Sequence, residues 1–560
     1  MTTMQKKTGQ YYTKLEVVNA MVDMIEYRTD VKLYTKKILE PSAGDGAFLF
    51  VVISRLIESV RSALNFDELI EHDEVLIGLL KDCIRAIEVD TEVYNKLKVE
   101  TVELLLSEGL NIVAANELAQ SWIVNEDFLS WNVNTQEKFD YVIGNPPYIR
   151  VENMDSKTLA IYRERFSTMF DRADIYIAFI EHGLKMLSPE GILSYICTDR
   201  FTKNNYGKEL RKFINKYFRV KYFIDIHKTQ PFQQEVSSYP CIFGIDRQLG
   251  KDTICISSDS LSERDMKKVV KDVVSGQVIE TSNSYKIRSW FKKSEPWIMD
   301  FEIGPILQKL QLMYPSIKEA PNGVQCKVGV ATGLNKVFLV SEETIEKYKL
   351  ENDVLIPILT KNHLKSCEIC WDGTHLINTF DENNQAINLD DFPNTKAYLE
   401  LHKERLSNRA FVKKGKSGFN WYYTQEKVRL KEIKTPKIVF PDISLKSRML
   451  IENGKYYPEG SLYYLLPGHW DILTLRIILE SPIGLAFVKA YSTRMRGGYI
   501  RYQKQSVEKV CLPRDVDDQL EEELHRAWLN KDQQKLNLLI KKLYNLDCSE
   551  MNTLIKYTNS

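Results

Sequence analysis

The chain has 560 residues, of which 44% are hydrophobic and 27% charged, so it can form two or three packed cores and is too apolar to be disordered. Its 76 basic and 76 acidic residues balance, so net charge indicates no partner. No apolar run reaches the roughly 20 residues of a membrane span, the first residues lack a signal-peptide pattern, and the nine cysteines are scattered. These features predict a reduced, cytoplasmic protein that does not bind membranes.

Short apolar runs alternate with helical patterns over the first 245 residues. The predicted strands are Lys37–Glu40, Ile84–Asp90, Trp122–Asn125, Tyr141–Asn145, Ile192–Thr198, Lys221–Ile226 and Cys241–Ile245. Helical patterns flank them at Leu15–Glu26, Ala47–Val60 and Asp174–Leu187. This alternation predicts an α/β fold with a doubly wound, mostly parallel sheet. Ligands bind such sheets beyond the carboxyl ends of the strands, so functional residues are expected in the turns there.

The first predicted strand ends at Glu40 and leads into a turn, Pro-Ser-Ala-Gly-Asp-Gly, at 41–46. Glycines in such a turn let the backbone approach a ligand closely. No Gly-Lys-Ser/Thr follows, which excludes a P-loop, and Leu49 stands where a dinucleotide fingerprint has its third glycine. An acidic residue ahead of the turn suits a cationic or hydroxyl-bearing ligand, although a purely structural turn fits the same residues.

The next two strand ends are also acidic. The second strand ends in Glu88-Val89-Asp90, and a carboxylate there can accept hydrogen bonds from both hydroxyls of a ribose. Its long separation from Glu40 predicts an inserted helical segment at Phe66–Leu80. After the third strand, Asp127-Phe128 can bind adenine, because the carboxylate accepts from the exocyclic amine and the ring stacks on the base. Each pair, taken alone, also fits an ordinary strand end.

The most specific motif, Asn145-Pro146-Pro147-Tyr148, follows the fourth predicted strand. Two prolines end a strand and stiffen the turn after it. An amine on a heteroaromatic ring is a poor nucleophile, because its lone pair is delocalised into the ring. Acceptors on both N–H bonds, from the Asn145 side chain and the Pro146 carbonyl, favour a pyramidal nitrogen, while Tyr148 stacks on the ring. The alternative is a strand-capping turn without a catalytic role.

The order of these motifs, preceded by a Tyr-x-Thr segment, resembles that of the gamma-class, TaqI-like N6-adenine DNA methyltransferases. The resemblance is close over residues 6–245. It implies a seven-stranded methyltransferase sheet with one antiparallel edge strand, and S-adenosyl-L-methionine as the cofactor. The cofactor contacts that it implies are Tyr11, Thr13, Glu40, Pro41, Ala43, Gly44, Gly46, Glu88, Val89, Asp127, Phe128 and Asn145.

The resemblance also implies the catalytic residues. They are Asn145, Pro146, Pro147 and Tyr148, with a second aromatic residue in a later loop. Phe232 is the candidate, and it would hold a flipped adenine against Tyr148. A core position at the edge of a loop is the alternative for Phe232.

After residue 250 strands and helices no longer alternate. Residues 401–450 contain 13 Lys and Arg against 4 Asp and Glu. We expect a catalytic domain at 1–250, an α+β target-recognition domain at 251–515 and a helical segment at 516–560. Segments that could face DNA are Thr332–Lys336, Lys361–His363, Arg409–Lys416, Phe419–Tyr423 and Arg494–Tyr499.

These features predict a site-specific enzyme that methylates N6 of adenine in double-stranded DNA, of restriction–modification or epigenetic type, with a separate cognate restriction endonuclease as a candidate partner. One alternative is a protein glutamine-N5 methyltransferase, which is disfavoured because more than 300 residues follow the sheet. A combined restriction enzyme and methyltransferase lacks room for a nuclease ahead of the sheet. A DNA-specificity subunit without catalysis would not need the intact motifs. No His or Cys cluster has metal-ligand spacing, so no metal is expected.

Overall fold

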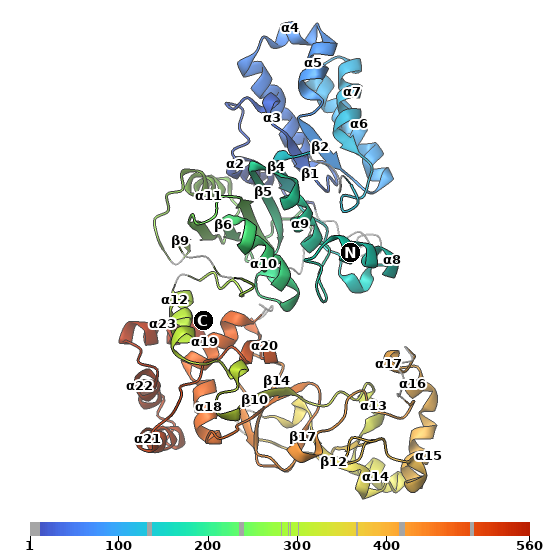
Figure 1. The fold of residues 1–560 in the computed structure, drawn as a ribbon, viewed down its shortest axis with the longest axis vertical. Coiled ribbons are helices and arrows are strands. Elements are labelled where there is room, and N and C mark those ends of the chain that lie inside the picture. Colours follow the sequence, from blue (N-terminus) through green and yellow to red (C-terminus); the bar gives the residue numbers. More distant parts are fainter. Residues whose placement is uncertain are drawn as a thin grey trace. The chain divides into compact units, whose positions relative to one another are not determined.

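The computed structural model describes residues 12–131, 137–234, 240–281, 283–288, 291, 293–300, 302–365, 368–413, 420–492 and 498–559. The chain forms two compact units, residues 1–301 and residues 302–560 (Figure 1). The division falls at residue 301 instead of near 250, because the segment after residue 250 adds two strands and a helix to the first sheet. The helices after residue 516 belong to the second unit.

One sheet forms the centre of the first unit. Its strands are β1 (Ile38–Glu40), β2 (Ile84–Ile87), β3 (Ile123–Val124), β4 (Phe139–Gly144), β5 (Leu187–Thr198), β6 (Arg219–Asp225), β7 (Pro240–Asp246), β8 (Thr253–Ser257) and β9 (Ser284–Ile287). They are arranged in the order β3-β2-β1-β4-β5-β7-β6-β8-β9. The seven predicted strands are all present, and the prediction of a mostly parallel sheet is confirmed.

The prediction of seven strands with one antiparallel edge strand is wrong in two respects. β7 is antiparallel to both of its neighbours, β5 and β6, and therefore lies inside the sheet. β8 pairs in parallel with β6, and β9 pairs antiparallel with β8 and forms the edge. The run Thr253–Ser257 is mostly buried, but it lies where the regular alternation of the sequence stops, so the sequence pattern places it in the next domain.

Helices cover both faces of this sheet. They are α2 (Leu15–Met24), α3 (Ala47–Ala63), α4 (Phe66–Ile70), α5 (Asp73–Leu80), α6 (Thr91–Ser107), α7 (Ile112–Trp122), α8 (Ser156–Arg165), α9 (Tyr176–Met186), α10 (Lys208–Tyr217) and α11 (Glu263–Ser275). Successive residues of a strand point to opposite faces. Ile38 and Ile143 pack with α2, α3 and α11, whereas Leu39 and Val142 pack with α9 and α10. The sheet is thus doubly wound, and α4 and α5 are the predicted insertion.

The second unit has two four-stranded sheets and a two-stranded ladder. Its strands are β10 (Gln325–Val328), β11 (Leu339–Val340), β12 (Leu355–Leu359), β13 (His375–Ile377), β14 (Lys437–Pro441), β15 (Ile443–Ser444), β16 (Leu450–Glu452), β17 (Tyr457–Pro458), β18 (Leu462–Leu466) and β19 (Ile500–Arg501). The sheet orders are β10-β18-β14-β16, which is antiparallel throughout, and β11-β13-β12-β17. This mostly antiparallel pairing agrees with the predicted α+β architecture.

The helices of the second unit follow no regular alternation with the strands. They are α12 (Ile303–Met313), α13 (Asn335–Phe338), α14 (Glu342–Tyr348), α15 (Pro393–Leu401), α16 (Lys403–Ser407), α17 (Ala410–Lys413), α18 (Ile472–Glu480), α19 (Pro482–Tyr491), α20 (Lys504–Val507), α21 (Asp518–Leu529), α22 (Gln533–Leu543) and α23 (Cys548–Asn559). Among the described residues of both units, no helix combines the length and the apolar character that a membrane crossing requires.

A buried ion pair joins β14 to β16. Lys437 Nζ lies 2.7 Å from Glu452 Oε2, and the two side chains are 0% and 1% exposed. Lys437 also donates to the Ile433 carbonyl at 3.0 Å. Burial lowers the pKa of the lysine, and the facing carboxylate opposes that shift. Removal of one partner would leave an uncompensated charge in the core.

We therefore expect Glu452→Ala to lower the free energy of unfolding of the second unit by about 3–5 kcal/mol. Urea unfolding of the full chain, monitored by hydrogen–deuterium exchange of peptides from β14 and β16, measures the change. Glu523→Ala is the control, because Glu523 pairs with Lys535 at the surface of the same unit. Equal losses of unfolding free energy in the two variants would show that the buried ion pair stabilises the unit no more than the surface pair does.

Candidate active site

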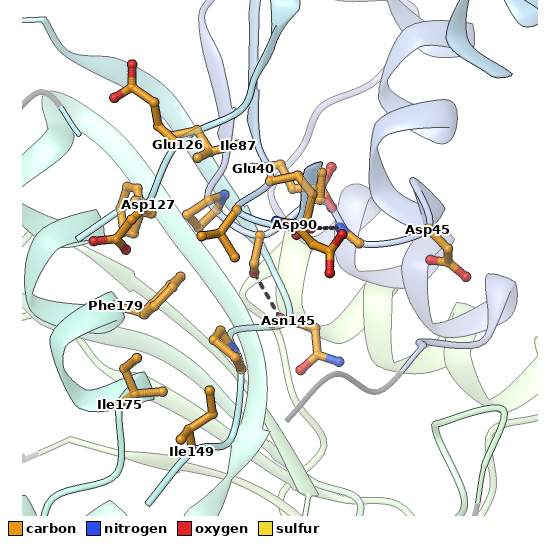
Figure 2. Close-up of a pocket in the computed structure, with 18 of the residues that line it drawn as sticks. Glu40, Asp45, Ile87, Asp90, Glu126, Asp127, Asn145, Ile149, Ile175 and Phe179 are labelled. Carbon is orange, nitrogen blue, oxygen red and sulfur yellow. Dashed lines mark hydrogen bonds between the residues drawn. The ribbon is translucent and has the colours of Figure 1, made fainter. Parts of the chain in front are cut away.

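A cavity of about 530 Å³ opens beyond the carboxyl ends of β1, β2 and β4 (Figure 2). β1 pairs in parallel with β2 on one side and with β4 on the other, so the carboxyl ends of the three strands meet at one edge of the sheet. The predicted residues that line the cavity are Thr13, Glu40, Pro41, Ala43, Gly44, Glu88, Val89, Asp127, Phe128, Asn145 and Pro147. The fold thus brings together segments that are far apart in the sequence.

Glu40 is a buried acidic side chain at this cavity, with 4% of its surface exposed. Its Oε2 atom has no hydrogen-bond partner among the described residues. Burial raises the pKa of this carboxyl well above its usual range, and the negative charges of Asp45 and Glu88 raise it further. An ionised carboxylate without a partner is costly inside a protein. A ligand with positive charge would therefore be strongly stabilised here.

Glu88 holds two turns at the acidic side of the cavity. Its Oε2 accepts a hydrogen bond from the Gly44 N–H at 2.9 Å, and its Oε1 accepts from the Asp90 N–H at 2.8 Å. Burial raises the pKa of Glu88 above its usual value. Gly44 has a φ of +54°, a left-handed conformation that favours glycine. Glu88 therefore organises the turn after β1, a role that the sequence did not indicate.

Two residues that the sequence did not predict, Tyr162 and Phe179, complete the side of the cavity next to Asp127 and Phe128. The Tyr162 hydroxyl donates to Asp127 Oδ2 at 3.0 Å, and the Phe179 ring lies 5.1 Å from the Phe128 ring. Both come from helices, α8 and α9, whose orientation toward the sheet decides which residues face the cavity. Their aromatic character alone fits an ordinary core position equally well.

The cavity has a charged region and an apolar region. Figure 2 shows Ile149, Ile175 and Phe179 together on one side, while Glu40 and Asp90 lie toward the other. Such a division suits a ligand with a charged, hydroxyl-bearing part and a flat apolar part.

Asn145 stands at the corner after β4, and hydrogen bonds hold it in three directions. Its Oδ1 accepts from the Tyr148 hydroxyl at 2.8 Å, and its Nδ2 donates to Thr13 Oγ1 at 3.3 Å. Ser42 Oγ donates to its backbone carbonyl at 3.0 Å, one of the dashed lines in Figure 2. The corner is therefore fixed to the turn after β1 and to the N-terminal segment.

Some predicted residues do not line the cavity. They are Gly46, Pro146, Tyr148 and Phe232, and Tyr11 lies outside the described residues. Gly46 begins α3 with a φ of +80°, and a Cβ there would lie 2.6 Å from side-chain atoms of Phe50 and Leu97. Gly46 is thus required for the packing at the start of α3, because a side chain at this position would collide with Phe50 and Leu97.

The rings of Phe232 and Tyr148, which are predicted to hold a flipped base between them, are not parallel. The two rings meet edge to face, with centroids 6.5 Å apart and an interplanar angle of 70°. Phe232 is 1% exposed and belongs to the core on one face of the sheet. A base stacked face to face on both rings would need the two rings parallel, whereas an edge-to-face contact with one of them would not. The observed packing agrees with the core alternative, and face-to-face stacking of a base on both rings would require one ring to turn.

Two of the basic residues expected to face DNA have structural roles instead. Arg409 is 7% exposed and donates to backbone carbonyls, including that of Thr332 at 3.0 Å. Burial lowers its pKa to about 10. His363 is buried and accepts from a backbone N–H at 3.1 Å. Residues 414–419 and 494–497 of the other expected segments lie outside the described residues.

The fold also brings together three potential metal ligands of the second unit that are distant in the sequence, Asp471, Glu521 and His525. Thr474 Oγ1 lies 2.8 Å from both Glu521 Oε1 and His525 Nε2, and His525 Nε2 lies 3.0 Å from Asp471 Oδ1. Asp471 also caps α18. These hydrogen bonds account for the arrangement, and spacing along the sequence gave no sign of it.

Comparison with known proteins defines the class. The family described as Eco57I restriction-modification methylase matches residues 29–232, from before β1 to Phe232. The structure of the Type IIL restriction-modification enzyme MmeI in complex with DNA has a similar fold, with a TM-score of 0.62 at 12% identity, and the match covers 100% of this chain and 80% of that chain. The family match includes β1, the corner after β4 and Phe232, and the solved structure shares the fold of the chain.

Two relatives match over nearly their whole length. Type II methyltransferase M.BstVI from Geobacillus stearothermophilus is 36% identical, with 97% of each chain covered. Type II methyltransferase M.PaeR7I from Pseudomonas aeruginosa is 34% identical, with 98% of this chain and 93% of the relative covered. The chain belongs to the type II DNA methyltransferases of restriction–modification systems, in the Eco57I family and the gamma class.

Proposed function

We propose that this methyltransferase transfers a methyl group from S-adenosyl-L-methionine to N6 of an adenine that is flipped out of double-stranded DNA. The observation that carries the proposal is the Asn145-Pro146-Pro147-Tyr148 corner, whose first residue reaches the rim of an acidic cavity. Such a corner suits a conjugated amine, and the cavity suits a cationic cofactor.

The residues around the cavity fit S-adenosyl-L-methionine. Glu40, with its unpartnered buried oxygen, would face the cationic part, and Glu88 would bind the ribose hydroxyls. Asp127 with Phe128 and Phe179 would hold the adenine ring. When bound, the cofactor supplies an electrophilic methyl group to the nitrogen.

Asn145 and Pro146 would orient the target amine. The Asn145 Oδ1 and the Pro146 carbonyl would accept its two N–H bonds, which favours a pyramidal nitrogen with a directed lone pair. The Tyr148 hydroxyl donates to Oδ1 at 2.8 Å, and a carboxamide oxygen can accept two hydrogen bonds, so this contact can fix the amide while the amine binds. No general base is required, because the proton can leave after transfer.

The second unit would select the DNA sequence. Base edges and phosphates must both be contacted for a specific site, and the stretch 401–450 has 13 Lys and Arg against 4 Asp and Glu. A separate restriction endonuclease with the same target sequence is the partner that we propose for a modification enzyme of this kind.

The proposal is tested by expressing the chain in a host without adenine methylation of its own. Mass spectrometry of the digested DNA should find N6-methyldeoxyadenosine, and sequencing that detects modified bases should place it in one short motif. N4-methylcytosine would refute the choice of adenine. Methylated glutamine in a host protein, with unmodified DNA, would favour the alternative of a protein methyltransferase.

Phe232→Ala is expected to weaken base flipping. Stacking on an aromatic ring is worth about 1–3 kcal/mol per base, which corresponds to a loss of about 5- to 150-fold in the flipped population. Fluorescence of 2-aminopurine at the target position of a duplex reports flipping. Phe232→Leu is the control, because it restores apolar volume without a ring face. A wild-type response from Phe232→Leu would assign Phe232 to the core and not to the base.

A further inference from the structure

The N-terminal segment 12–14 lies between the cavity and the loop 230–234, which we call the Phe232 loop. Tyr12 and Thr13 line the cavity. The Lys14 N–H donates to the Pro231 carbonyl at 2.9 Å, and the Gln233 N–H donates to the Tyr12 carbonyl at 2.9 Å. These bonds enclose an antiparallel bridge between Thr13 and Phe232. Residues 12–14 of the cavity wall are therefore joined to the Phe232 loop by two backbone hydrogen bonds around one isolated bridge.

A side-chain contact joins the same segment to the catalytic corner. Thr13 is 3% exposed, and its Oγ1 accepts from Asn145 Nδ2 at 3.3 Å. This bond orients the amide so that Oδ1 faces the Tyr148 hydroxyl. A threonine hydroxyl has one donor and two acceptor positions, so it can also donate to a ligand in the cavity.

The segment is fixed on its C-terminal side. α2 begins at Leu15, directly after the bridge, and its buried face packs into the core of the sheet. A ligand that contacts Tyr12 and Thr13 therefore acts on a segment of three residues, 12–14, that is anchored at its C-terminal end by α2. The backbone hydrogen bonds between residues 12–14 and the Phe232 loop would then hold that loop in position as well.

We propose that residues 12–14 couple the cavity to the Phe232 loop and to Asn145, so that the cofactor and the flipped base bind cooperatively. The inference rests on the proposed function, because it takes the two ligands to be S-adenosyl-L-methionine and an adenine. Coupling is reciprocal: a cofactor that favours the base-binding arrangement is itself bound more tightly when the base is present.

The coupling is measured with S-adenosylhomocysteine, which lacks the transferable methyl group. Calorimetry gives its affinity for the full chain alone and for the chain saturated with a duplex that carries the motif found by sequencing. We expect the affinity to be at least about fivefold tighter on DNA. Gln233→Pro removes the N–H that donates to Tyr12, and the ratio should fall toward one. Gln233→Ala keeps the N–H of this exposed residue and should keep the ratio.

A second pair of variants tests the side-chain link. Thr13→Val should abolish the change that S-adenosylhomocysteine causes in the fluorescence of 2-aminopurine at the target position, while Thr13→Ser keeps it. Loss of affinity for S-adenosylhomocysteine without DNA would show that Gln233→Pro does not fold. In that case the two Thr13 variants test the coupling by themselves.

A ratio of one in the wild type, or equal ratios in Gln233→Pro and Gln233→Ala, would overturn the coupling. Equal fluorescence responses in Thr13→Val and Thr13→Ser would overturn the part assigned to Thr13. If adenine methylation is intact in those experiments, only the coupling fails. Absence of methylated adenine in the wild type would instead refute the proposed function.

Discussion

Asn145→Ala is expected to lower the rate of methyl transfer by at least about 10²–10³-fold, the usual cost of losing one hydrogen bond made in the transition state. The substitution removes the acceptor that would hold the target amine beside the cofactor. It also removes the contacts to Tyr148 and Thr13. The bulk of the cavity wall is unchanged, so cofactor affinity should remain close to that of the wild type. Single-turnover transfer and calorimetry with S-adenosylhomocysteine measure the two quantities separately.

Asn153→Ala is the matched control for this prediction. Asn153 is another asparagine that lines the cavity, but it lies in the turn before α8 and not at the corner after β4. Its replacement should affect transfer far less. Equal losses of rate and of cofactor affinity in Asn145→Ala would show that Asn145 acts in cofactor binding and would refute its role toward the amine.

Glu40→Gln is expected to weaken cofactor affinity about ten- to a hundredfold, because hydrogen bonds to charged groups contribute about 1.5–3 kcal/mol. The substitution keeps the shape of a side chain that is 4% exposed and removes its charge. Glu126→Gln is the control, because Glu126 lines the same cavity but is exposed to solvent. Equal losses in the two variants would show that the buried position of Glu40 has no special part in binding.

The pH dependence of binding follows from the raised pKa of Glu40. Below that pKa the free protein holds a proton on Glu40, and a cationic ligand must displace it. Cofactor affinity should therefore rise with pH as Glu40 of the free protein loses its proton, and level off above the raised pKa. Calorimetry in buffers of different ionisation enthalpy detects the released proton. An affinity that does not change over this range, in the wild type, would contradict the assignment.

Stability should respond in the opposite sense. Because the folded pKa of Glu40 is raised, the stabilising contribution of its neutral form is present at low pH and is lost as pH rises through that pKa. Without cofactor, Glu40→Gln should thus be more stable than the wild type at pH 8 and about equal to it at pH 5. Thermal unfolding at the two pH values measures this difference.

The sequence predicted those parts of the fold that leave a local pattern. Seven strands appeared as apolar runs, because a strand that is buried on both faces needs apolar residues throughout. The position of β7 inside the sheet could not be predicted, since the side chains of Cys241–Ile245 are equally apolar at an edge or in the interior. β8 and β9 were missed as members of this sheet because pairing at its edge depends on contacts between segments that are distant in sequence.

The site was predictable where a motif carries its own chemistry. Glu40, Glu88 and Asn145 follow strands, and parallel strands bring their ends together. Tyr162 and Phe179 come from helices, and only the packing of those helices shows which residues face the cavity. The geometry of Phe232 and Tyr148 is likewise a matter of tertiary packing, because a ring in a loop can stack on a ligand or on its neighbours.

The most direct test of the central claim is a crystal structure of the chain with S-adenosylhomocysteine and a duplex that contains the target motif. We expect an extruded adenine whose exocyclic nitrogen lies within hydrogen-bonding distance of Asn145 Oδ1 and of the Pro146 carbonyl, with the sulfur atom of the cofactor opposite that nitrogen. An adenine amine that contacts neither oxygen, or a cofactor that binds outside the cavity beside Glu40, would contradict it.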